Sequence, residues 1–410
     1  MIPRKRLDIG WTDLLAGAQF CLWSERSEHI EQRLKQVWCD TTSASLMSLS
    51  VRSGFDALLQ TLNFEPGSEI LVSAVTIRGM TRIIEAHGLV PVPIDVDFTR
   101  LSVRPEAMAK AVTEHSKAIL IAHLFGSRMA MEPILQFAQA HQLLVIEDCA
   151  QAYAGDGYWG HSLSDVSLFS FGPIKTATAL AGGVLLFRNA ALCEAVRAHQ
   201  DTWPVQSQWR FLARTTKYAL LMLLSYRIPY SLFVALCSLL QINRDRLISN
   251  SVRGFSGDAF WQKIRQRPSA ALLALLERRL QQFDPVTITE RIQLVEQVIQ
   301  LQPSWELPGQ QAFRHTHWVF PILCDAPEHL MAYLWRQGFD ATRGGSSLYV
   351  VDAPVNRPET DPVEAKRAFQ HLLYLPVYAG LSSQDLNRLV EAIHEWNAPE
   401  KQASVLNSSV

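Results

Sequence analysis

The sequence predicts an α/β protein, with one large domain around a mainly parallel sheet and a smaller C-terminal α+β domain. Short apolar runs alternate with helix-like segments from about residue 42 to 200, which is typical of βαβ units. The last third of the chain mixes strand and helix patterns without that alternation. A chain of 410 residues with 48% hydrophobic content is also long enough for two packed cores.

Seven apolar runs are the candidate strands of the large sheet. They span residues 45–50, 69–74, 90–96, 117–124, 143–148, 166–171 and 182–188. Helices are expected between the first five, among them Phe55–Leu62 and Met131–His141. This alternation predicts parallel strands joined by helices that cover the sheet.

The C-terminal part predicts a smaller domain and the helices that lead to it. Residues 270–283 and 288–301 have the pattern of long helices. Beyond them we expect a strand over 314–325, a helix over 327–339 and an amphipathic helix over 383–396. We therefore divide the chain into a large domain, 1–265, and a second part, 266–410, with the linking helices and the small domain.

One segment within an atypical insertion, about residues 203–260, is unusually apolar. Tyr218–Ile242 has about the length of a membrane span, but Arg227 and Pro229 divide it. A single span would separate the two domains, so we reject it. A buried helix pair at a subunit contact and a hairpin dipping into one leaflet both remain open. The leaflet interpretation is favoured by nearby basic residues, namely Arg210, Arg214, Lys217, Arg244, Arg246 and Arg253.

Composition limits the partners and the compartment. A formal net charge of -1 offers no field that attracts nucleic acid, so a small polar ligand is expected. The six cysteines show no CxxC spacing, which argues against a zinc site and against a disulfide framework and predicts no metal. No apolar run of signal-peptide length follows the basic N-terminus, so we expect a cytoplasmic protein, with membrane association left open.

Residues at strand ends carry the candidate chemistry, because ligands of such sheets gather at the carboxyl ends of the strands. Ser53-Gly54-Phe55 stands at an expected helix start, where backbone amides favour a phosphate. Asp148 ends one strand, and Ser170 ends another. Lys175 follows five residues later, in a turn of small residues.

Each of these residues alone has an ordinary structural explanation as a helix cap, a surface acid or a solvated lysine. Together they predict a site for pyridoxal phosphate. The amine of Lys175 would bond to the aldehyde, and Asp148 would pair with the protonated pyridine nitrogen. Gln151 could reach the phenolic oxygen of the ring.

Several stretches, in this order, resemble the DegT/DnrJ/EryC1/StrS aminotransferase family. They are SGFDALLQTLNFEPGSEILVSAVT (53–76), GLVPVPIDVDFTRLSV (88–103), KAILIAHLFG (117–126), residues 145–183 around VIEDCAQAYAGDG and SLFSFGPIKTATALAGG, and LLYLPVYAGLSSQDLNRLVEAI (372–393). The resemblance covers nearly the whole chain except about 203–260. It implies the fold type I architecture of pyridoxal phosphate enzymes and an activity mainly on nucleotide-linked keto sugars.

The resemblance also implies roles for single residues. Lys175 matches the Schiff-base lysine, Asp148 the partner of the pyridine nitrogen, and Gln151 the residue over the ring hydroxyl. Ser170 matches a phosphate ligand, and Gly54 with Phe55 matches the turn that cradles the phosphate. A lysine at 175 favours transamination, because family members that dehydrate sugars lack it. Cofactor sites in this fold are completed across a two-fold interface, which implies a homodimer.

Three positions depart from the family pattern. Phe55 replaces a threonine in the phosphate turn, so a hydroxyl ligand is missing. Ile77 stands where the family commonly has an aromatic residue stacked on the cofactor ring. Arg265, in Arg265-Gln266-Arg267, aligns with the family's Asn-Tyr-Arg motif, and its guanidinium could contact the phosphate of the neighbouring subunit.

The function expected from these residues is transfer of an amino group from an amino acid, by family analogy glutamate, to a nucleotide-linked keto sugar used for polysaccharides or glycosylated metabolites. Two alternatives remain. Residues 341–354 lack the histidine and proline pattern that often follows there, and with the apolar segment 218–242 this suggests a lipid-linked acceptor and peripheral membrane contact. The three altered cofactor contacts instead leave room for a non-catalytic regulator that binds pyridoxal phosphate.

Overall fold

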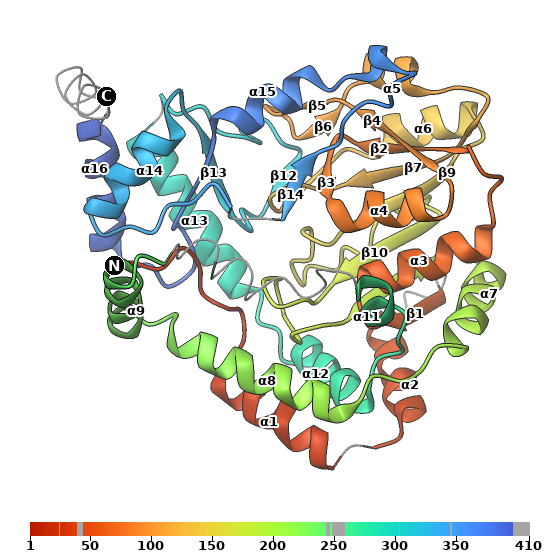
Figure 1. Cartoon of the computed structure of the whole chain (residues 1–410), viewed down its shortest axis with the longest axis horizontal. Coiled ribbons are helices and arrows are strands. Elements are labelled where there is room, and N and C mark those ends of the chain that lie inside the picture. Colours follow the sequence, from red (N-terminus) through yellow and green to blue (C-terminus); the bar gives the residue numbers. More distant parts are fainter. Residues whose placement is uncertain are drawn as a thin grey trace.

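A computed structural model describes residues 1–23, 25–38, 44–242, 247, 259–302, 304–344 and 347–396. Arg244, Arg246 and Arg253 of the predicted basic surroundings lie outside these residues. Figure 1 shows the large sheet with its helices on the right and a smaller unit of strands and helices on the left.

The large unit is built on a seven-stranded mixed sheet of order β1-β11-β10-β9-β7-β2-β4. These strands are β1 (Ala44–Ser48), β2 (Glu69–Ser73), β4 (Val90–Ile94), β7 (Ser116–Ala122), β9 (Leu144–Asp148), β10 (Val166–Ser170) and β11 (Gly183–Phe187). The five strands from β10 to β4 run parallel, and β11 is antiparallel to both of its neighbours. All seven predicted strands and the predicted α/β class are confirmed.

Helices cover both faces of this sheet because its strands are apolar on both sides. In β2, Ile70 and Val72 face a core shared with α3 (Val51–Leu62), whereas Leu71 faces a second core on the opposite side. The helices that share the core of α3 are α4 (Arg78–Ala86), α7 (Ala190–Asp201) and α11 (Phe260–Ile264). The opposite face is covered by α1 (Trp11–Leu22), α2 (Ser27–Trp38), α8 (Gln208–Leu223), α12 (Ala270–Gln281), α5 (Pro105–Ala111), α6 (Glu132–Ala140) and α15 (Val363–His371).

The smaller unit has its own core between α13 (Val286–Leu301), α14 (Pro327–Arg336) and α16 (Ser383–Trp396). These helices pack on a two-stranded sheet of β13 (Phe320–Leu323) and β15 (Leu372–Leu375). The N-terminus also belongs here, since Ile2 bridges to Phe339. The domain boundary at 265 stays a prediction; α12 packs with α1 and α2 beside the large sheet.

The prediction of one strand over 314–325 is wrong. That stretch forms β12 (Arg314–His315), which pairs with β8 (Ser127–Arg128) of the large unit, and β13, which pairs within the small unit. His317 lies between them with a φ of 49°, a left-handed conformation that no strand contains. The remaining short elements are β3 (Val75–Ile77), paired with β14 (Leu348–Val350), then β5 (Val96–Asp97), paired with β6 (Ser102–Val103), and the 3₁₀ turn η1 (Pro358–Thr360).

The apolar insertion forms a helical hairpin of α8 and α9 (Arg227–Leu239), bent by 93° between the helices. No single helix of the described residues has the length and apolar character to span a membrane, although the bent pair together meets that criterion. In Figure 1 the hairpin runs along the lower left, with α9 close to the N-terminus and the small unit.

Close packing of α3 against the sheet leads to a test of stability. A Cβ atom at Gly54 would lie only 2.2 Å from Leu185 Cδ1, so Gly54→Ala should lower the free energy of unfolding by about 1–3 kcal/mol through overpacking. Leu185→Ala removes the obstructing side chain, so the double variant should lose less stability than the two single variants together. Equilibrium urea unfolding measures both effects, and additive losses would contradict the contact.

Candidate active site

Lys175 lies in the loop that joins β10 to β11, and the loop is held by its own backbone and by the N-terminal segment. Lys175 N donates to Gly172 O over 3.0 Å, and Thr178 Oγ1 donates to the same carbonyl over 2.7 Å. Ala177 has a φ of 52° and donates its N–H to Asp8 Oδ2. The small residues around Lys175 therefore allow a tight loop that is held by its own hydrogen bonds.

Two segments distant in sequence close around this loop at the carbonyl of Ile174. Trp318 Nε1 donates to Ile174 O over 3.0 Å, and Lys5 Nζ donates to the same oxygen over 2.9 Å. The amines of Lys175 and Lys5 lie 4.2 and 3.9 Å from the centroid of the Trp318 ring. Gly126 makes this approach possible, because a Cβ there would lie 2.5 Å from Trp318 N.

The environment of Lys175 favours its neutral amine. Burial lowers the pKa of Lys175 to about 8, with the nearby positive charge of Arg52 acting in the same direction and Asp148 opposing both. An amine must be neutral to attack a carbonyl or to accept a proton, so this shift suits a nucleophile and proton carrier.

Asp148 ends β9 in the middle of the sheet, where it is buried with 7% exposure. Burial raises the pKa of Asp148, while the Ala150 N–H bonded to Oδ1 and the charges of Lys175, His123 and Arg52 lower it. Lys175 and Asp148 thus lie close enough to influence each other's charge, as the predicted site requires. Only one carboxylate oxygen has a hydrogen bond to a described residue, which leaves acceptor capacity for a cation such as a protonated ring nitrogen.

Gln151 lies directly after β9, and its side-chain orientation is set by Phe125. Phe125 N donates to Gln151 Oε1 over 2.9 Å, in a loop where Phe125 has a φ of 58°. Because the amide oxygen is used in this way, the amide nitrogen is available to donate a hydrogen bond elsewhere. A phenolate oxygen is a suitable acceptor, so the geometry agrees with the predicted role of Gln151.

The phosphate turn needs a correction. The helix α3 begins at Val51 with Ser50 as its N-cap, four residues before the predicted start at Phe55, and Ser50 Oγ accepts from Ser53 N. Gly54 N already donates to Ser50 O, and Phe55 is fully buried inside the helix. The prediction that Gly54 and Phe55 offer free amides to a phosphate is therefore wrong. Both residues instead serve the packing of α3 against the sheet.

At this helix start the backbone N–H of Val51 is the first of the helix and has no partner within it, so it could donate to a phosphate. Gly183 opens this position, since a Cβ there would lie 2.6 Å from Val51 N. Ser170, the predicted phosphate ligand, pairs with Gly183 across β10 and β11 and is therefore close to the same helix start. Its contact with a phosphate stays a prediction.

Arg52 is a residue that the sequence analysis missed. Its charge influences Asp148 and Lys175, and burial lowers the pKa of Arg52 to about 10. Gly79 of α4 gives the side chain room, because a Cβ there would lie 2.6 Å from Arg52 Cδ. The signal that could have revealed Arg52 is Ser50, a capping residue that directly follows a strand.

Arg265 does not have the predicted free guanidinium. Its Nε lies 2.8 Å from Asp56 Oδ2 and its Nη2 lies 3.2 Å from Asp56 Oδ1, and the cation lies over the ring of Trp261. His87 bonds to the same carboxylate, so a fully buried acid holds Arg265 within its own chain. This ion pair anchors the end of α11 to α3, and a contact of Arg265 with the phosphate of a neighbouring subunit stays a prediction.

Ile77 ends β3 and immediately precedes α4. It pairs with Leu348 of β14 and packs, half-buried, against the core that contains α3. Its position against a cofactor ring stays a prediction.

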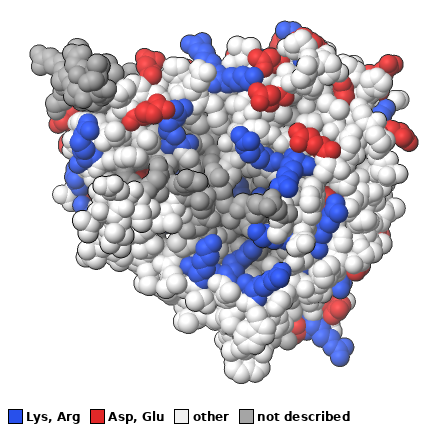
Figure 2. Space-filling view, in the orientation of Figure 1, with Lys and Arg blue, Asp and Glu red and all other residues white. Residues whose placement is uncertain are grey.

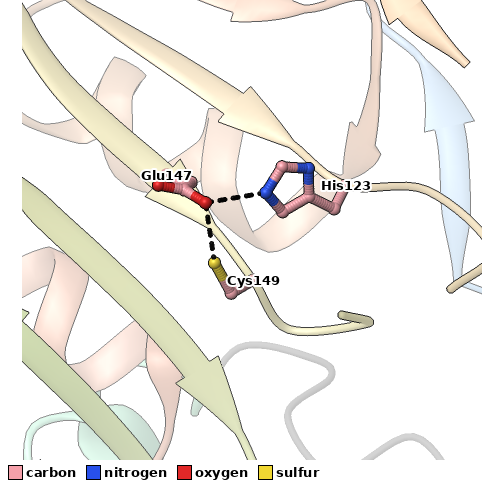
Figure 3. Close-up of side chains that lie close together, drawn as sticks. All are labelled: His123, Glu147 and Cys149. Atoms are coloured by element: carbon pink, nitrogen blue, oxygen red, sulfur yellow. Dashed lines mark hydrogen bonds and ion pairs between the residues drawn. The ribbon is translucent and has the colours of Figure 1, made fainter. Parts of the chain in front are cut away.

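Glu147 lies next to Asp148 in β9 and organises a buried network, shown in part in Figure 3. Its Oε1 accepts hydrogen bonds from His123 Nε2 over 2.8 Å, from Cys149 Sγ over 3.4 Å and from Tyr158. Its Oε2 accepts from His161 N and Ser164 Oγ. The other ring nitrogen of His123 accepts from Met129 N, which makes Nε2 the protonated one.

His123, Glu147 and Cys149 could by type and proximity hold a metal ion. Their ligand atoms are already hydrogen-bonded to one another, and the carboxylate of Glu147 is shared among five donors. We therefore interpret the cluster as a hydrogen-bond network that fixes the end of β9 and not as a metal site. Its consequence for the site is a rigid placement of Asp148, the next residue along the strand.

The arrangement fits pyridoxal phosphate. An amine of lowered pKa, a buried carboxylate and an oriented amide lie at the ends of neighbouring strands, beside the N-terminus of α3. Figure 2 shows that Lys and Arg side chains gather around the middle of this face, where an anionic cofactor or substrate would be attracted.

The sequence model of the DegT/DnrJ/EryC1/StrS aminotransferase family matches residues 12–218, half of the chain. The chain belongs to this family. This membership confirms the predicted family and the predicted enzyme class, a pyridoxal phosphate-dependent aminotransferase. It also confirms the predicted cofactor, because the family depends on pyridoxal phosphate. A curated relative, the "Pleiotropic regulatory protein" of Geobacillus stearothermophilus, is 34% identical over 156 residues, which are 36% of this chain and 42% of that protein.

Solved structures show the same fold over nearly the whole chain. The structure of DesI in the presence of its TDP-sugar product is 17% identical, with a TM-score of 0.67, and the match covers 100% of this chain and 95% of that one. NtdA from Bacillus subtilis, with its bound cofactor PMP, is 18% identical, with a TM-score of 0.64 and coverage of 94% and 81%. The fold class is thereby that of pyridoxal phosphate-dependent aminotransferases.

The charges around Lys175 predict how pH controls its reaction with the cofactor. Covalent attachment in the apo protein should accelerate as the amine loses its proton and level off above about pH 8. Arg52→Ala removes a positive neighbour and should move this inflection upward, whereas Asp148→Asn should move it downward. Borohydride trapping and mass measurement across pH give the inflection. Arg188→Ala is the control, and shifts in the same direction for both site variants would contradict the assignment.

The network of Glu147 predicts a cost in stability. Glu147→Gln leaves at least one buried donor without its acceptor and should lower the free energy of unfolding by about 1–3 kcal/mol at pH 7. The surrounding donors lower the pKa of Glu147 to about 2, so its stabilisation is complete above pH 4.5 and declines as the pH falls toward 2. In urea unfolding, the difference in free energy of unfolding between wild type and Glu147→Gln should therefore become smaller as the pH falls. Glu114→Gln, at an exposed site, should unfold like the wild type at every pH.

Proposed function

We propose that this protein is a pyridoxal phosphate-dependent aminotransferase that transfers an amino group from glutamate to a nucleotide-linked keto sugar. The observation that carries the proposal is the amine of Lys175, whose pKa is lowered by burial to about 8, beside the buried carboxylate of Asp148. Family membership and the DesI structure with its TDP-sugar product support the class of acceptor.

Each residue then has a defined task. Pyridoxal phosphate, when bound, supplies an aldehyde carbon and a ring that accepts an electron pair. Asp148 would hold the ring by its positive nitrogen, and the amide nitrogen of Gln151 would donate to the ring oxygen. Lys175 Nζ would bond to the aldehyde when no donor is present, and its neutral amine would take the proton from the donor's α-carbon. The amine performs the reverse transfer for the acceptor ketone.

We also propose that the active unit is a homodimer, as the fold type I architecture implies. Arg265 is held by Asp56 through Nε and Nη2, and in the dimer we expect its remaining donor group to be the one available to a neighbouring phosphate. Sedimentation at micromolar concentration would test the dimer directly, and a monomer with full activity would refute it.

A second candidate function is that of a regulator that binds the cofactor without turnover. The name of the curated relative and the departures at Ile77 and in the phosphate turn keep this candidate open. Adding glutamate distinguishes the two. An aminotransferase should lose its visible absorbance band as the amino group moves to the cofactor, whereas a binding protein should keep the band.

Replacement of Lys175 provides the most direct test of the mechanism. Lys175→Ala should lower the rate of the glutamate half-reaction by ~100-fold or more, because the proton carrier is removed. The visible band of the covalently attached cofactor should also disappear. Stopped-flow absorbance measures both. Lys110→Ala, at an exposed position of α5, is the matched control, and near-normal turnover in Lys175→Ala would refute the assignment.

A further inference from the structure

An apolar cavity of about 170 Å³ lies beside the Lys175 loop. Leu221, Leu224 and Phe233 of the α8–α9 hairpin form one side, and Ile174 and Trp318 form the other. The ring of Trp318 also lies 4.2 Å from Lys175 Nζ. The cavity and the active site therefore share a wall, and a molecule reacting at Lys175 could place an apolar part in the cavity.

The cavity has room for a short hydrocarbon segment. An apolar cavity of about 150 Å³ accommodates benzene, so this one takes roughly five or six carbon atoms, about one isoprene unit. A longer chain would have to continue along another apolar surface. The α8–α9 hairpin, which forms one side of the cavity, offers such a surface on its outside.

Cations stand next to the apolar wall. Lys5 and Arg6 line the same cavity. Among the described residues Lys5 has no carboxylate within ion-pair distance, and its amine instead donates to Ile174 O and lies over the Trp318 ring. Burial and the charges of Arg291 and Lys175 lower the pKa of Lys5. A phosphate group would relieve this repulsion, so the lining suits an amphiphile with a phosphate beside a hydrocarbon chain.

The outside of the hairpin carries a continuous apolar stripe. Ile228, Leu232, Leu236 and Leu239 lie on one face of α9, and each is more than half exposed. The stripe continues onto the outer face of α1, since Trp11 Nε1 donates to Tyr226 OH over 3.1 Å. The other exposed apolar residues of α1, α8 and α9 are Leu15, Leu22, Trp209, Leu220 and Leu223. The lower left margin of Figure 2, where Figure 1 places α8 and α9, is almost free of charged side chains.

The charge of this segment indicates which surface would cover the stripe. Between Thr202 and Ile242 the sequence holds no Asp or Glu, while Arg210, Lys217 and Arg227 are basic. Trp11 and Tyr226 place indole N–H and phenol O–H groups at the rim, which is typical of side chains at a membrane interface. Arg227 is paired with Asp385 of α16, but the hairpin itself carries no acidic residue, so its apolar face with basic residues beside it matches an anionic lipid surface.

We infer that the α8–α9 hairpin lies in one leaflet of an anionic membrane and that the amino acceptor is lipid-linked, with its phosphate near Lys5 and the first part of its chain in the cavity. The inference rests on the proposed aminotransferase function and replaces the free nucleotide-linked acceptor by a membrane-borne one.

Flotation with vesicles tests the inference on the full holoenzyme. Wild-type protein should float with vesicles of phosphatidylcholine containing phosphatidylglycerol, and less with phosphatidylcholine alone. The double variant Leu232→Asp/Leu236→Asp should float at least tenfold less, and it should fold because both side chains are exposed. Val363→Asp, an equally exposed site on α15, is the matched control and should float like the wild type.

Each outcome has a separate meaning. Wild-type protein that stays at the bottom, or a double variant that floats as well as the wild type, would overturn the inference. If the double substitution instead lowers the sedimenting mass of lipid-free protein, the stripe is a contact between copies, which would also overturn it. The glutamate half-reaction of wild-type protein is measured separately, so its failure refutes the proposed function without depending on flotation.

Discussion

Keeping a lysine amine neutral next to a buried carboxylate is the constraint on which this site depends. Burial lowers the pKa of Lys175, but the same burial raises the pKa of Asp148, and each charge stabilises the other. Arg52 shifts the balance, because its positive charge disfavours a charged Lys175 and favours an ionised Asp148. Burial and Arg52 together outweigh the effect of Asp148 on the amine, so the pKa of Lys175 stays lowered, at about 8, beside this carboxylate.

The rest of the fold serves this placement. The network around Glu147 holds the end of β9, and the Lys175 loop is closed by segments from both ends of the chain, at Lys5 and at Trp318. The small unit therefore contributes directly to the surroundings of Lys175. Its first strand segment, β12, pairs with β8 of the large unit and brings Trp318 to the loop. A change in that pairing would alter the surroundings of the reactive amine.

The apolar α8–α9 hairpin bears on which acceptor the protein would bind. The same helices that expose leucines on their outer side line the cavity beside Trp318 on their inner side. A membrane contact and an acceptor site built from one hairpin would couple where the protein sits to what it accepts. Such a coupling would distinguish the chain from a freely diffusing enzyme whose sugar acceptor is bound by polar groups alone.

The sequence by itself determined the sheet, the strand ends and the pairing of Lys175 with Asp148, because alternation of apolar runs and the position of polar residues at strand ends are local properties. It could not place the start of α3, since adding four residues at the N-terminus leaves the apolar pattern of the helix nearly unchanged. Only the tertiary structure showed that Gly54 packs on Leu185, that Arg52 takes the site beside Asp148 and that Asp56 holds Arg265. These outcomes depend on which side chains meet across elements, and contacts between residues far apart in the chain leave no local signal in a single sequence.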